Sequence, residues 1–411
     1  MSRLSTNPHQ FAQRIDRPSW TMSILFLLLF SGPPRFRYRD PTASLEGKID
    51  PVVVFQVAVW LIAGIWLLVY FMNAKRRRAL RWGLLQKISA LFVLLIGFSV
   101  AASVAPSLTA FKVFQVLVVM LFTFVFVERY GTARYLDELF WCSVIMCGAV
   151  ALCAFIAPDL VTDISEMGAT RLRGELIADT GVVSMLAVLL LLGWMRRLWK
   201  PLFLILLLLC FSLLILSLAR WAYIAVLAFA VLAVSKRSGS KGARWIGAGI
   251  LTGFSVFLVS GGMNTLAEFR DPASVSTLSD RLGLWAYLSD ITMSSAPWAG
   301  LGYYSASRLY GPEYNPGLGT AHSMFVEAFV GAGWPALVVL VLLCVLLGVY
   351  AVKALGRNNA DYSMIVAALV FGVVLGGAVG APIESGPLAV AFWGLVTVVS
   401  EQSEMKASAA L

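Results

Sequence analysis

Long apolar runs separated by short polar connectors recur along the whole chain of 411 residues. A run of about 20 apolar residues can cross a hydrocarbon core of roughly 30 Å as an α-helix. The pattern therefore predicts an all-α polytopic membrane protein with about 12 transmembrane helices. The expected spans are 19–32, 51–73, 85–105, 110–127, 139–157, 178–195, 201–218, 220–235, 244–262, 323–352, 361–381 and 386–401.

The stretch 201–235 is almost entirely apolar, and Arg220 is its main interruption. A single helix of this length would extend about 50 Å, which is too long for one crossing. Basic residues flank both ends of the stretch, so both ends are expected on the same face of the membrane. We therefore expect two short spans that turn near Leu218–Arg220, which puts Arg220 at the opposite face.

Basic residues in the connectors predict the orientation of the chain. Alternating the connectors between the two faces collects most Lys and Arg on one side, including the clusters 75–78, 196–197 and 236–237. Cytoplasmic loops are enriched in Lys and Arg, so we expect both termini in the cytoplasm. We expect residues 1–411 to form a single integral membrane domain. Residues 263–322 are then an extracytoplasmic insert with short amphipathic helices.

The composition agrees with a membrane protein, since 59% of the residues are hydrophobic and only 13% are charged. The net charge of +10 is spread over many connectors, so it reports orientation rather than a nucleic-acid partner. The five cysteines lie in apolar runs without paired spacing, which indicates neither disulfides nor a metal site. No nucleotide-binding motif is present, and we expect no cofactor.

His322 is one of only two histidines in the chain, and the other, His9, lies in a polar N-terminal segment. It stands where a loop rich in Gly, Pro and Tyr meets the apolar run 323–352, on the predicted outer face. The unperturbed pKa of histidine lies near working pH, so the imidazole can accept a proton. The pattern fits a catalytic base, and it also fits a structural histidine bound by loop carbonyls.

Four arginines are expected on this outer face. Arg220 is costly at a membrane boundary, so it either snorkels to headgroups or binds an anion. Arg281, Trp285 and Leu288 follow one another at helical spacing, which puts Arg281 beside a buried helix face. Arg171 and Arg173 in the motif RLRGE can bind an anion or pair with nearby acidic residues.

Two carboxylates lie near the same face. Glu327 follows Ser323, the residue after His322, by one helical turn, and Glu384 lies in the short connector APIESGP. Either could orient the imidazole, bind sugar hydroxyls or form a structural ion pair. The aromatic side chains of Trp285 and Tyr303 could stack on sugar rings, although such residues are also common at membrane interfaces.

Five motifs occur in family order over residues 165–350: RLRGELIAD, SLARWAYIAVLA, SDRLGLW, PWAGLGYYS and AHSMFVEAFVGAGWPALV. Together they resemble the superfamily of O-antigen ligases and O-antigen polymerases of the Wzy type, the glycosyltransferases of bacterial envelopes. Members usually have His-Asn where this chain has His322-Ser323. The resemblance implies that Arg220 and Arg281 bind the diphosphate of a polyprenyl-diphosphate-linked glycan donor.

The resemblance further implies that His322 deprotonates a hydroxyl group of a glycan or lipid-linked acceptor. It implies a bacterial inner-membrane location, an extracytoplasmic active site and a role in lipopolysaccharide or exopolysaccharide assembly beside other assembly proteins. Arg171, Arg173, Glu327, Glu384, Tyr303 and Trp285 are the expected substrate-binding residues. Ligase and polymerase activities differ only in the acceptor and are both open at this point.

A lipid-linked glycan flippase or another polytopic transporter is the alternative function. Ion-coupled carriers usually place ionisable groups near the membrane midplane and contain repeated halves. Acidic residues are absent from the centres of the expected spans, and no internal repeat is evident. These features favour the transferase over an ion-coupled carrier.

Overall fold

The computed structural model describes residues 18–32, 51–73, 82–164, 170–173, 177–194, 200–237, 281–315, 320–355, 360–380 and 383–409. The expected span 244–262 and the first part of the 263–322 insert lie outside the described residues.

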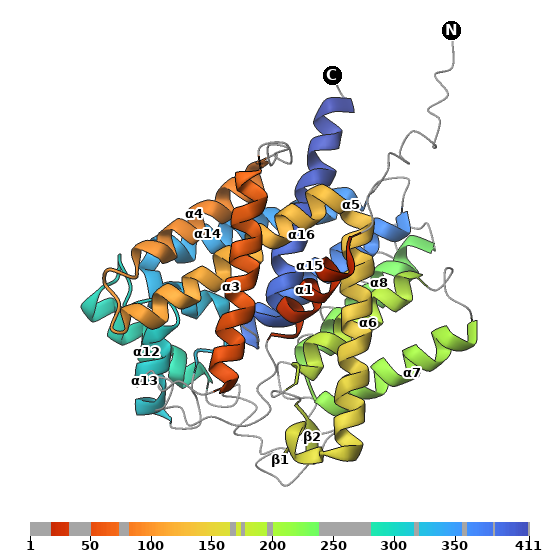
Figure 1. The fold of residues 1–411 in the computed structure, drawn as a ribbon, viewed down its shortest axis with the longest axis horizontal. Helices are drawn as coiled ribbons and strands as arrows, with labels where there is room; N and C mark the ends of the chain where they lie inside the picture. Colours follow the sequence, from red (N-terminus) through yellow and green to blue (C-terminus); the bar gives the residue numbers. More distant parts are fainter. Residues whose placement is uncertain are drawn as a thin grey trace.

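The described residues form twelve α-helices, one 3-10 turn and one small antiparallel hairpin (Figure 1). The α-helices are α1 (Trp20–Ser31), α3 (Pro51–Met72), α4 (Leu84–Phe98), α5 (Pro106–Ile156), α6 (Thr180–Trp194), α7 (Lys200–Ser217), α8 (Arg220–Arg237), α12 (Arg281–Ser295), α13 (Ser305–Tyr314), α14 (Met324–Ala354), α15 (Ala360–Val379) and α16 (Gly386–Ala409). The fold is therefore predominantly α-helical, as the apolar pattern predicts.

The hairpin was not predicted. Its strands β1 (Thr162–Ile164) and β2 (Thr170–Leu172) pair in antiparallel register after the 3-10 turn η2 (Pro158–Leu160). Each strand has three residues, which is too short for an alternating pattern to stand out in the sequence. The hairpin matters because β2 carries Arg171 and leads directly to Arg173.

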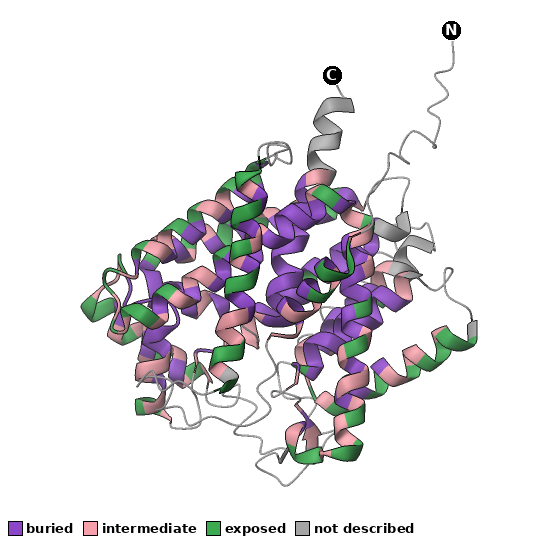
Figure 2. Ribbon diagram, in the orientation of Figure 1, coloured by how far each residue is buried: buried purple, intermediate pink, exposed green. Residues whose placement is uncertain are grey.

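Within the described residues, three helical segments are long and apolar enough to cross a membrane: Val53–Met72, Pro106–Ile156 and Met324–Ala354. Seven further helices are apolar but shorter. Large apolar side chains are exposed along α3, α7 and α14, as Figure 2 shows by the green stretches of α3 and α7. Exposed apolar faces of this extent fit contact with lipid rather than with water. The number of spans stays a prediction.

Two expected spans are joined in α5. This helix covers 110–127 and 139–156, and the connector between them is helical except at Gly131. Gly131 has φ 78° and ψ 159°, a conformation that strongly favours glycine. The chain changes direction there, so α5 comprises two helices on either side of a kink.

The turn expected within 201–235 is present. Helix α7 ends at Ser217, and α8 begins at Arg220. Leu218 between them has φ 53°, and the Tyr223 hydroxyl donates a hydrogen bond across the turn to the Ile215 carbonyl at 2.7 Å. The length argument thus identified both the break and the position of Arg220 at the start of a helix.

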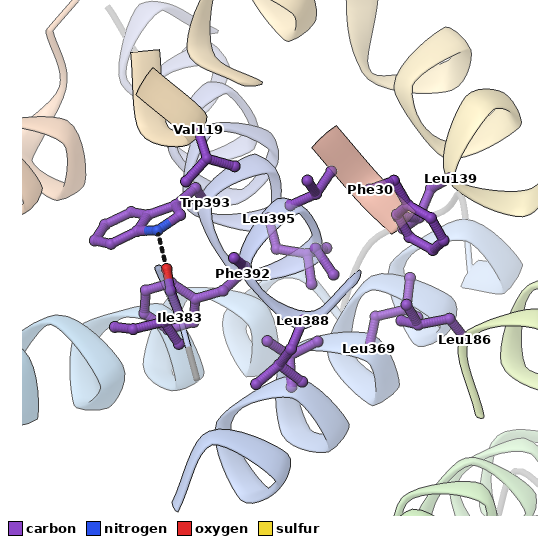
Figure 3. Packing of buried hydrophobic residues seen from close by; sticks show 14 of the residues in the cluster. Phe30, Val119, Leu139, Leu186, Leu369, Ile383, Leu388, Phe392, Trp393 and Leu395 are labelled. Carbon is purple, nitrogen blue, oxygen red and sulfur yellow. Dashed lines mark hydrogen bonds between the residues drawn. The ribbon is translucent and has the colours of Figure 1, made fainter. Parts of the chain in front are cut away.

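Helix α16 lies in the core, where it packs on α5, α15, α1, α14 and α4. Its side chains are buried almost continuously as far as Ser400 (Figure 2). In Figure 3 Trp393 donates a hydrogen bond from its indole nitrogen to the carbonyl of Ile383 at 3.0 Å. This bond ties the 383–385 turn to the helix, and the turn carries Glu384.

Helix α14 is broken near its start. Ala332 and Gly333 are non-helical, and Gly333 has φ 72°, so the expected span 323–352 is a short helix followed by a longer one. A broken helix leaves backbone groups without helical partners, which is costly in an apolar setting. The chain segment 297–304 supplies those partners.

Segment 297–304 binds the break through its backbone. Leu301 donates to the Val330 carbonyl at 2.8 Å, and Gly302 donates to the Gly331 carbonyl at 2.9 Å. Trp334 in turn donates to the carbonyl of Pro297 at 2.9 Å. The two backbones approach so closely that a Cβ atom on Gly331 would lie 2.5 Å from the Tyr303 Cα atom. The absence of a side chain at Gly331 therefore allows the two backbones to pack closely.

Gly331→Ala should destabilise the protein, because the added methyl group has no space and overpacking costs about 1–3 kcal/mol. Gly348→Ala in the same helix is the control, since a Cβ atom there meets nothing within 4 Å. The apparent melting temperature in one detergent should fall for Gly331→Ala and stay the same or rise for Gly348→Ala. Equal melting temperatures for both variants would contradict this packing.

Candidate functional site

Connectors that the charge pattern puts on the outer face come together in space. The Ser99 hydroxyl accepts a hydrogen bond from the Tyr303 backbone at 3.2 Å. The hydroxyls of Ser103, Thr109 and Ser305 form a triangle with oxygen–oxygen distances of 2.7–2.9 Å. These bonds attach the α4–α5 connector to the start of α13, so the segments share one face of the protein.

His322 lies in the short connector between α13 and α14. Its φ is 51°, in the left-handed region that histidine tolerates better than most non-glycine residues. The imidazole is hydrogen-bonded to the backbone of Gly380, at the end of α15. Strained backbone conformations concentrate at functional sites, and here one carries the side chain that we expect to act.

Three arginines act electrostatically on the imidazole. The charges of Arg281, Arg173 and Arg308 all act on His322. They come from α12, from the residue after β2 and from α13 respectively. We name these four residues the arginine–histidine cluster. The structure thus brings together His322 and two of the predicted arginines, Arg281 and Arg173, and adds Arg308.

The environment keeps the imidazole neutral. Burial and then the nearby charges of Arg281, Arg173 and Arg308 lower the pKa of His322 to about 3, against a smaller upward effect of the Gly380 hydrogen bond. Removal of solvent and like charges both disfavour the imidazolium ion. His322 is therefore unprotonated throughout the neutral range, which a general base must be.

Arg281 is held at the same helix end as His322. Its Nη1 atom donates a hydrogen bond to the carbonyl of Val379, the residue before Gly380. The last carbonyls of a helix carry partial negative charge, which favours cations. The end of α15 therefore binds both the guanidinium group and the imidazole.

Two side chains hold the residue before His322. The Ala321 N–H donates to Glu327 Oε1 at 3.0 Å, and the Ala321 carbonyl accepts from the Trp285 indole at 2.6 Å. Ala321 itself is 0% exposed. Glu327 Oε1 also accepts a hydrogen bond from the Ser307 hydroxyl at 2.6 Å. Glu327 and Trp285 thus fix the backbone that presents His322.

A buried ion pair lies next to this connection. Lys112 Nζ is 3.8 Å from Glu384 Oε1 and 4.0 Å from the centre of the Tyr304 ring. Glu384 is 2% exposed and Lys112 is 9% exposed. The pair is connected to the arginine–histidine cluster through α13, because Lys112 lies over the ring of Tyr304, the N-cap residue of α13, and Arg308 of the same helix acts on His322. Glu384 therefore forms a buried ion pair, which is one of the roles that the sequence allowed for it.

Glu327 is 5% exposed, and its Oε2 atom is buried with no hydrogen-bond partner among the described residues. An unpaired buried carboxylate oxygen is costly and rare. Within the described residues, no three or more His, Cys, Asp or Glu side chains lie together so that they could hold a metal ion.

Arg220 is the first residue of α8, and its charge is not among those acting on His322. It is connected to the cluster through its neighbour Trp221, which packs so closely that a Cβ atom on Gly380 would lie 3.0 Å from the indole nitrogen. Arg220 thus lies beside the end of α15, on the α8 side. Arg171 is paired in register with Asp163 on β1.

Tyr303 lies in the core rather than at the surface of the site. Its side chain is 1% exposed and its ring contacts Phe92, with 6.4 Å between the ring centres. Its carbonyl accepts a hydrogen bond from Thr109. A sugar could stack on this ring only if the surrounding segments moved.

The sequence reasoning missed Lys112 and Arg308. A lone lysine near the start of an otherwise apolar run is a signal for a buried partner, and Glu384 is that partner. Arg308 lies in SASRLYG among the tyrosines of the outer insert, and only the fold brings it to His322.

Residues 203–341 match the family model described as O-antigen ligase. The matched segment includes most of α7, all of α8, α12 and α13, and the first part of α14, and therefore contains Arg220, Arg281, Arg308 and His322. It confirms the predicted resemblance to the superfamily of O-antigen ligases and polymerases. No curated protein matches the chain by sequence.

Glu327→Leu should loosen the His322 connector, because it leaves the Ala321 N–H and the Ser307 hydroxyl without their acceptor. An unsatisfied buried donor costs about 1–3 kcal/mol. Glu327→Gln keeps an acceptor oxygen in the same position and is the matched control. The apparent melting temperature should fall clearly more for the Leu variant, and equal values for the two variants would contradict this role.

Proposed function

We propose that this chain, which carries the O-antigen ligase domain at residues 203–341, is a membrane glycosyltransferase that moves a glycan from a polyprenyl diphosphate to a hydroxyl acceptor. The family match supports the transferase class. The arginine–histidine cluster is the observation that carries the donor and the mechanism, because it combines anion-binding groups with an unprotonated base.

A lipid-diphosphate donor fits an outer-face site. Nucleotide sugars are absent outside the cytoplasm, so a transferase there needs an activated donor that arrives through the membrane. In our proposal the polyprenyl chain lies among the apolar helices while its diphosphate reaches the arginines. Arg makes bidentate contacts with phosphate oxygens, which supports this pairing.

Arg281 and Arg220 have the diphosphate-binding role in the mechanism. Negative charge grows on the diphosphate as the bond to the anomeric carbon breaks. Fixed guanidinium groups in a site of low dielectric stabilise that charge by several kcal/mol. The positions of Arg281 at the end of α15 and Arg220 beside Trp221 support a site between α12 and α8.

His322 is the proposed base. It takes the proton of the acceptor hydroxyl while the oxygen attacks the anomeric carbon opposite the diphosphate, which inverts the configuration. General base catalysis of this kind contributes about 10²–10⁴-fold. The left-handed backbone of His322 and the contacts of Ala321 support a preset imidazole position.

The remaining predicted substrate contacts are part of the same proposal. Arg173 acts on His322 and is suited to the diphosphate, with Arg171 beside it on the hairpin. Glu384, Tyr303, Trp285 and Glu327 have protein partners in this structure, so sugar contact at any of them requires exchange of those partners.

The acceptor is a glycan or a lipid-linked saccharide, and both O-antigen ligation and repeat-unit polymerisation fit the same chemistry. We further propose a location in the bacterial inner membrane with both termini in the cytoplasm. The orientation rests on the distribution of Lys and Arg, and the convergence of the predicted outer connectors supports it.

His322→Ala should lower transfer by at least about 100-fold, because the acceptor hydroxyl loses its base. The measurement is transfer of a labelled glycan from polyprenyl diphosphate by the full chain in liposomes. His9→Ala, the only other histidine position, is the matched control and should transfer at the normal rate. Normal transfer by His322→Ala would remove the base assignment.

Arg281→Lys should impair transfer although the charge is kept, because lysine lacks the planar pair of donors that fits a phosphate. We expect a rise in the KM for the donor together with a lower kcat. Arg129→Lys is the control, since Arg129 lies in the α5 connector that is predicted on the cytoplasmic face. Equal kinetics for Arg281→Lys and the control would count against diphosphate binding by Arg281.

A further inference from the structure

Helices α12 and α13 present two neighbouring tyrosine rings on the predicted outer face. The ring centres of Tyr287 on α12 and Tyr314, the last residue of α13, lie 5.6 Å apart, and the rings are tilted by 34°. Tyr314 is 39% exposed and Tyr287 is half-buried. The two helices pack against each other at the edge of the bundle (Figure 1), so the rings form one accessible aromatic surface.

The protein holds both rings in place. Tyr287 packs against a buried apolar cluster that includes Leu284 and Leu288. The hydroxyl group of Tyr314 lies directly against Gly283, where an added Cβ atom would collide with it. Rigid aromatic side chains offer a large contact area at a low cost in conformational entropy. The rings are therefore suited to bind a ligand without rearrangement.

A carboxylate borders the rings. The Tyr287 hydroxyl donates a hydrogen bond to Glu313 Oε2 at 3.0 Å, which fixes the carboxylate beside the aromatic surface. Glu313 is exposed, and a carboxylate has roughly four acceptor sites, so it can accept further hydrogen bonds from a ligand. Asp290 is also exposed and follows Tyr287 by about one turn of α12. We name Tyr287, Glu313 and Tyr314 the tyrosine platform.

The chemistry of the tyrosine platform fits a sugar ring. A sugar has apolar faces of C–H groups and hydroxyl groups around its edge. The tyrosine rings offer an apolar surface, and the adjacent carboxylate accepts hydroxyl protons in charge-assisted hydrogen bonds. The negative charges of Glu313 and Asp290 disfavour acidic sugars and anionic lipid headgroups. An uncharged saccharide is therefore the best match.

The tyrosine platform belongs to the same helices as the candidate site. Trp285 on α12 binds the carbonyl of Ala321, the residue before the proposed base. Tyr287 follows Arg281 by six residues, which is about 9 Å along a helix axis. A glycan whose diphosphate end is bound at Arg281 can therefore reach the tyrosine platform with a sugar beyond the reacting one.

We propose that the tyrosine platform is a saccharide subsite that binds an uncharged sugar of the glycan chain at a distance from the bond that is made or broken. This inference rests on the proposed function, because the glycan is the substrate of the proposed transferase. The subsite contributes affinity and directs the chain away from His322. It therefore favours glycans that are long enough to extend from the reacting centre to the rings.

The dependence on glycan length tests the subsite. Transfer by the full chain in liposomes is measured with polyprenyl diphosphates that carry one sugar or several sugars, and with acceptors of the same two lengths. Tyr314→Ala should raise the KM for a substrate with several sugars by about 2–10-fold, because one aromatic contact is lost. The KM for single-sugar substrates and the kcat should stay the same. Tyr314→Phe keeps the ring and should behave like the unaltered chain.

Trp298→Ala is the matched control. Trp298 is 73% exposed, lies in the connector after α12 and is not part of the tyrosine platform, so its loss should change neither KM. A rise in KM that is confined to long donors or to long acceptors supports the subsite and identifies the chain that passes over it. A rise that is equal for both lengths would indicate that Tyr314 anchors the protein at the membrane surface, and would overturn the subsite. An unchanged KM for long substrates would overturn it as well.

Two variants of Glu313 test the carboxylate. Glu313→Ala should raise the KM for the long substrate more than Glu313→Gln, because glutamine keeps an oxygen that accepts a hydroxyl proton. Equal KM values for the two variants would contradict hydrogen bonding between Glu313 and the sugar.

Binding of the free saccharide separates failure of the subsite from failure of the proposed function. The probe is the oligosaccharide released by mild acid from the same polyprenyl diphosphate, observed by saturation-transfer-difference NMR with the full chain in nanodiscs. A weaker signal for Tyr314→Ala than for the unaltered chain supports the subsite, and absence of transfer would then overturn the proposed function alone. Equal signals, or no signal from either protein, would overturn the subsite and leave a transferase that shows transfer standing.

Discussion

The backbone hydrogen bonds between segment 297–304 and the broken start of α14 are the constraint on which the site depends. A helix that stops at Ala332 and Gly333 inside an apolar bundle must find other partners for its backbone groups. Leu301 and Gly302 provide them. The same contact fixes the turn of α14 that carries Glu327, and Glu327 fixes Ala321 beside His322.

Backbone carbonyls hold several side chains of the candidate site. The carbonyls at the end of α15 bind Arg281 and His322, and the carbonyl of Ala321 binds Trp285. Leu218, Tyr304 and His322 are the non-glycine residues with positive φ in the described part of the chain. His322 belongs to the arginine–histidine cluster, Tyr304 lies against Lys112 of the ion pair, and Leu218 lies in the turn before Arg220. Local strain therefore coincides with the place where the chemistry is proposed, as in many functional sites.

The helical character of the fold can be predicted from the sequence, because a long apolar run indicates a membrane helix. The length of the apolar stretch also predicted the turn between α7 and α8, since 201–235 is too long for one crossing. The β1–β2 hairpin and the break in α14 could not be derived, because three-residue strands and backbone partners distant in sequence leave no periodic signal. For the site, residue type and predicted face selected His322, Arg281 and Arg173, and both arginines act on the imidazole in the structure. Arg308 and the partner of Lys112 depend on tertiary contacts, which only the fold provides.

The central claim is that Arg281 and Arg220 bind the donor diphosphate next to the base, His322. A cryo-EM structure of the full chain with a non-hydrolysable glycan analogue of a polyprenyl diphosphate tests it most directly. The prediction is that phosphate oxygens lie about 3 Å from the guanidinium nitrogens of Arg281 and Arg220. The anomeric carbon should then lie on the side of His322. A diphosphate bound away from these arginines, with His322 remote from the sugar, would contradict the mechanism.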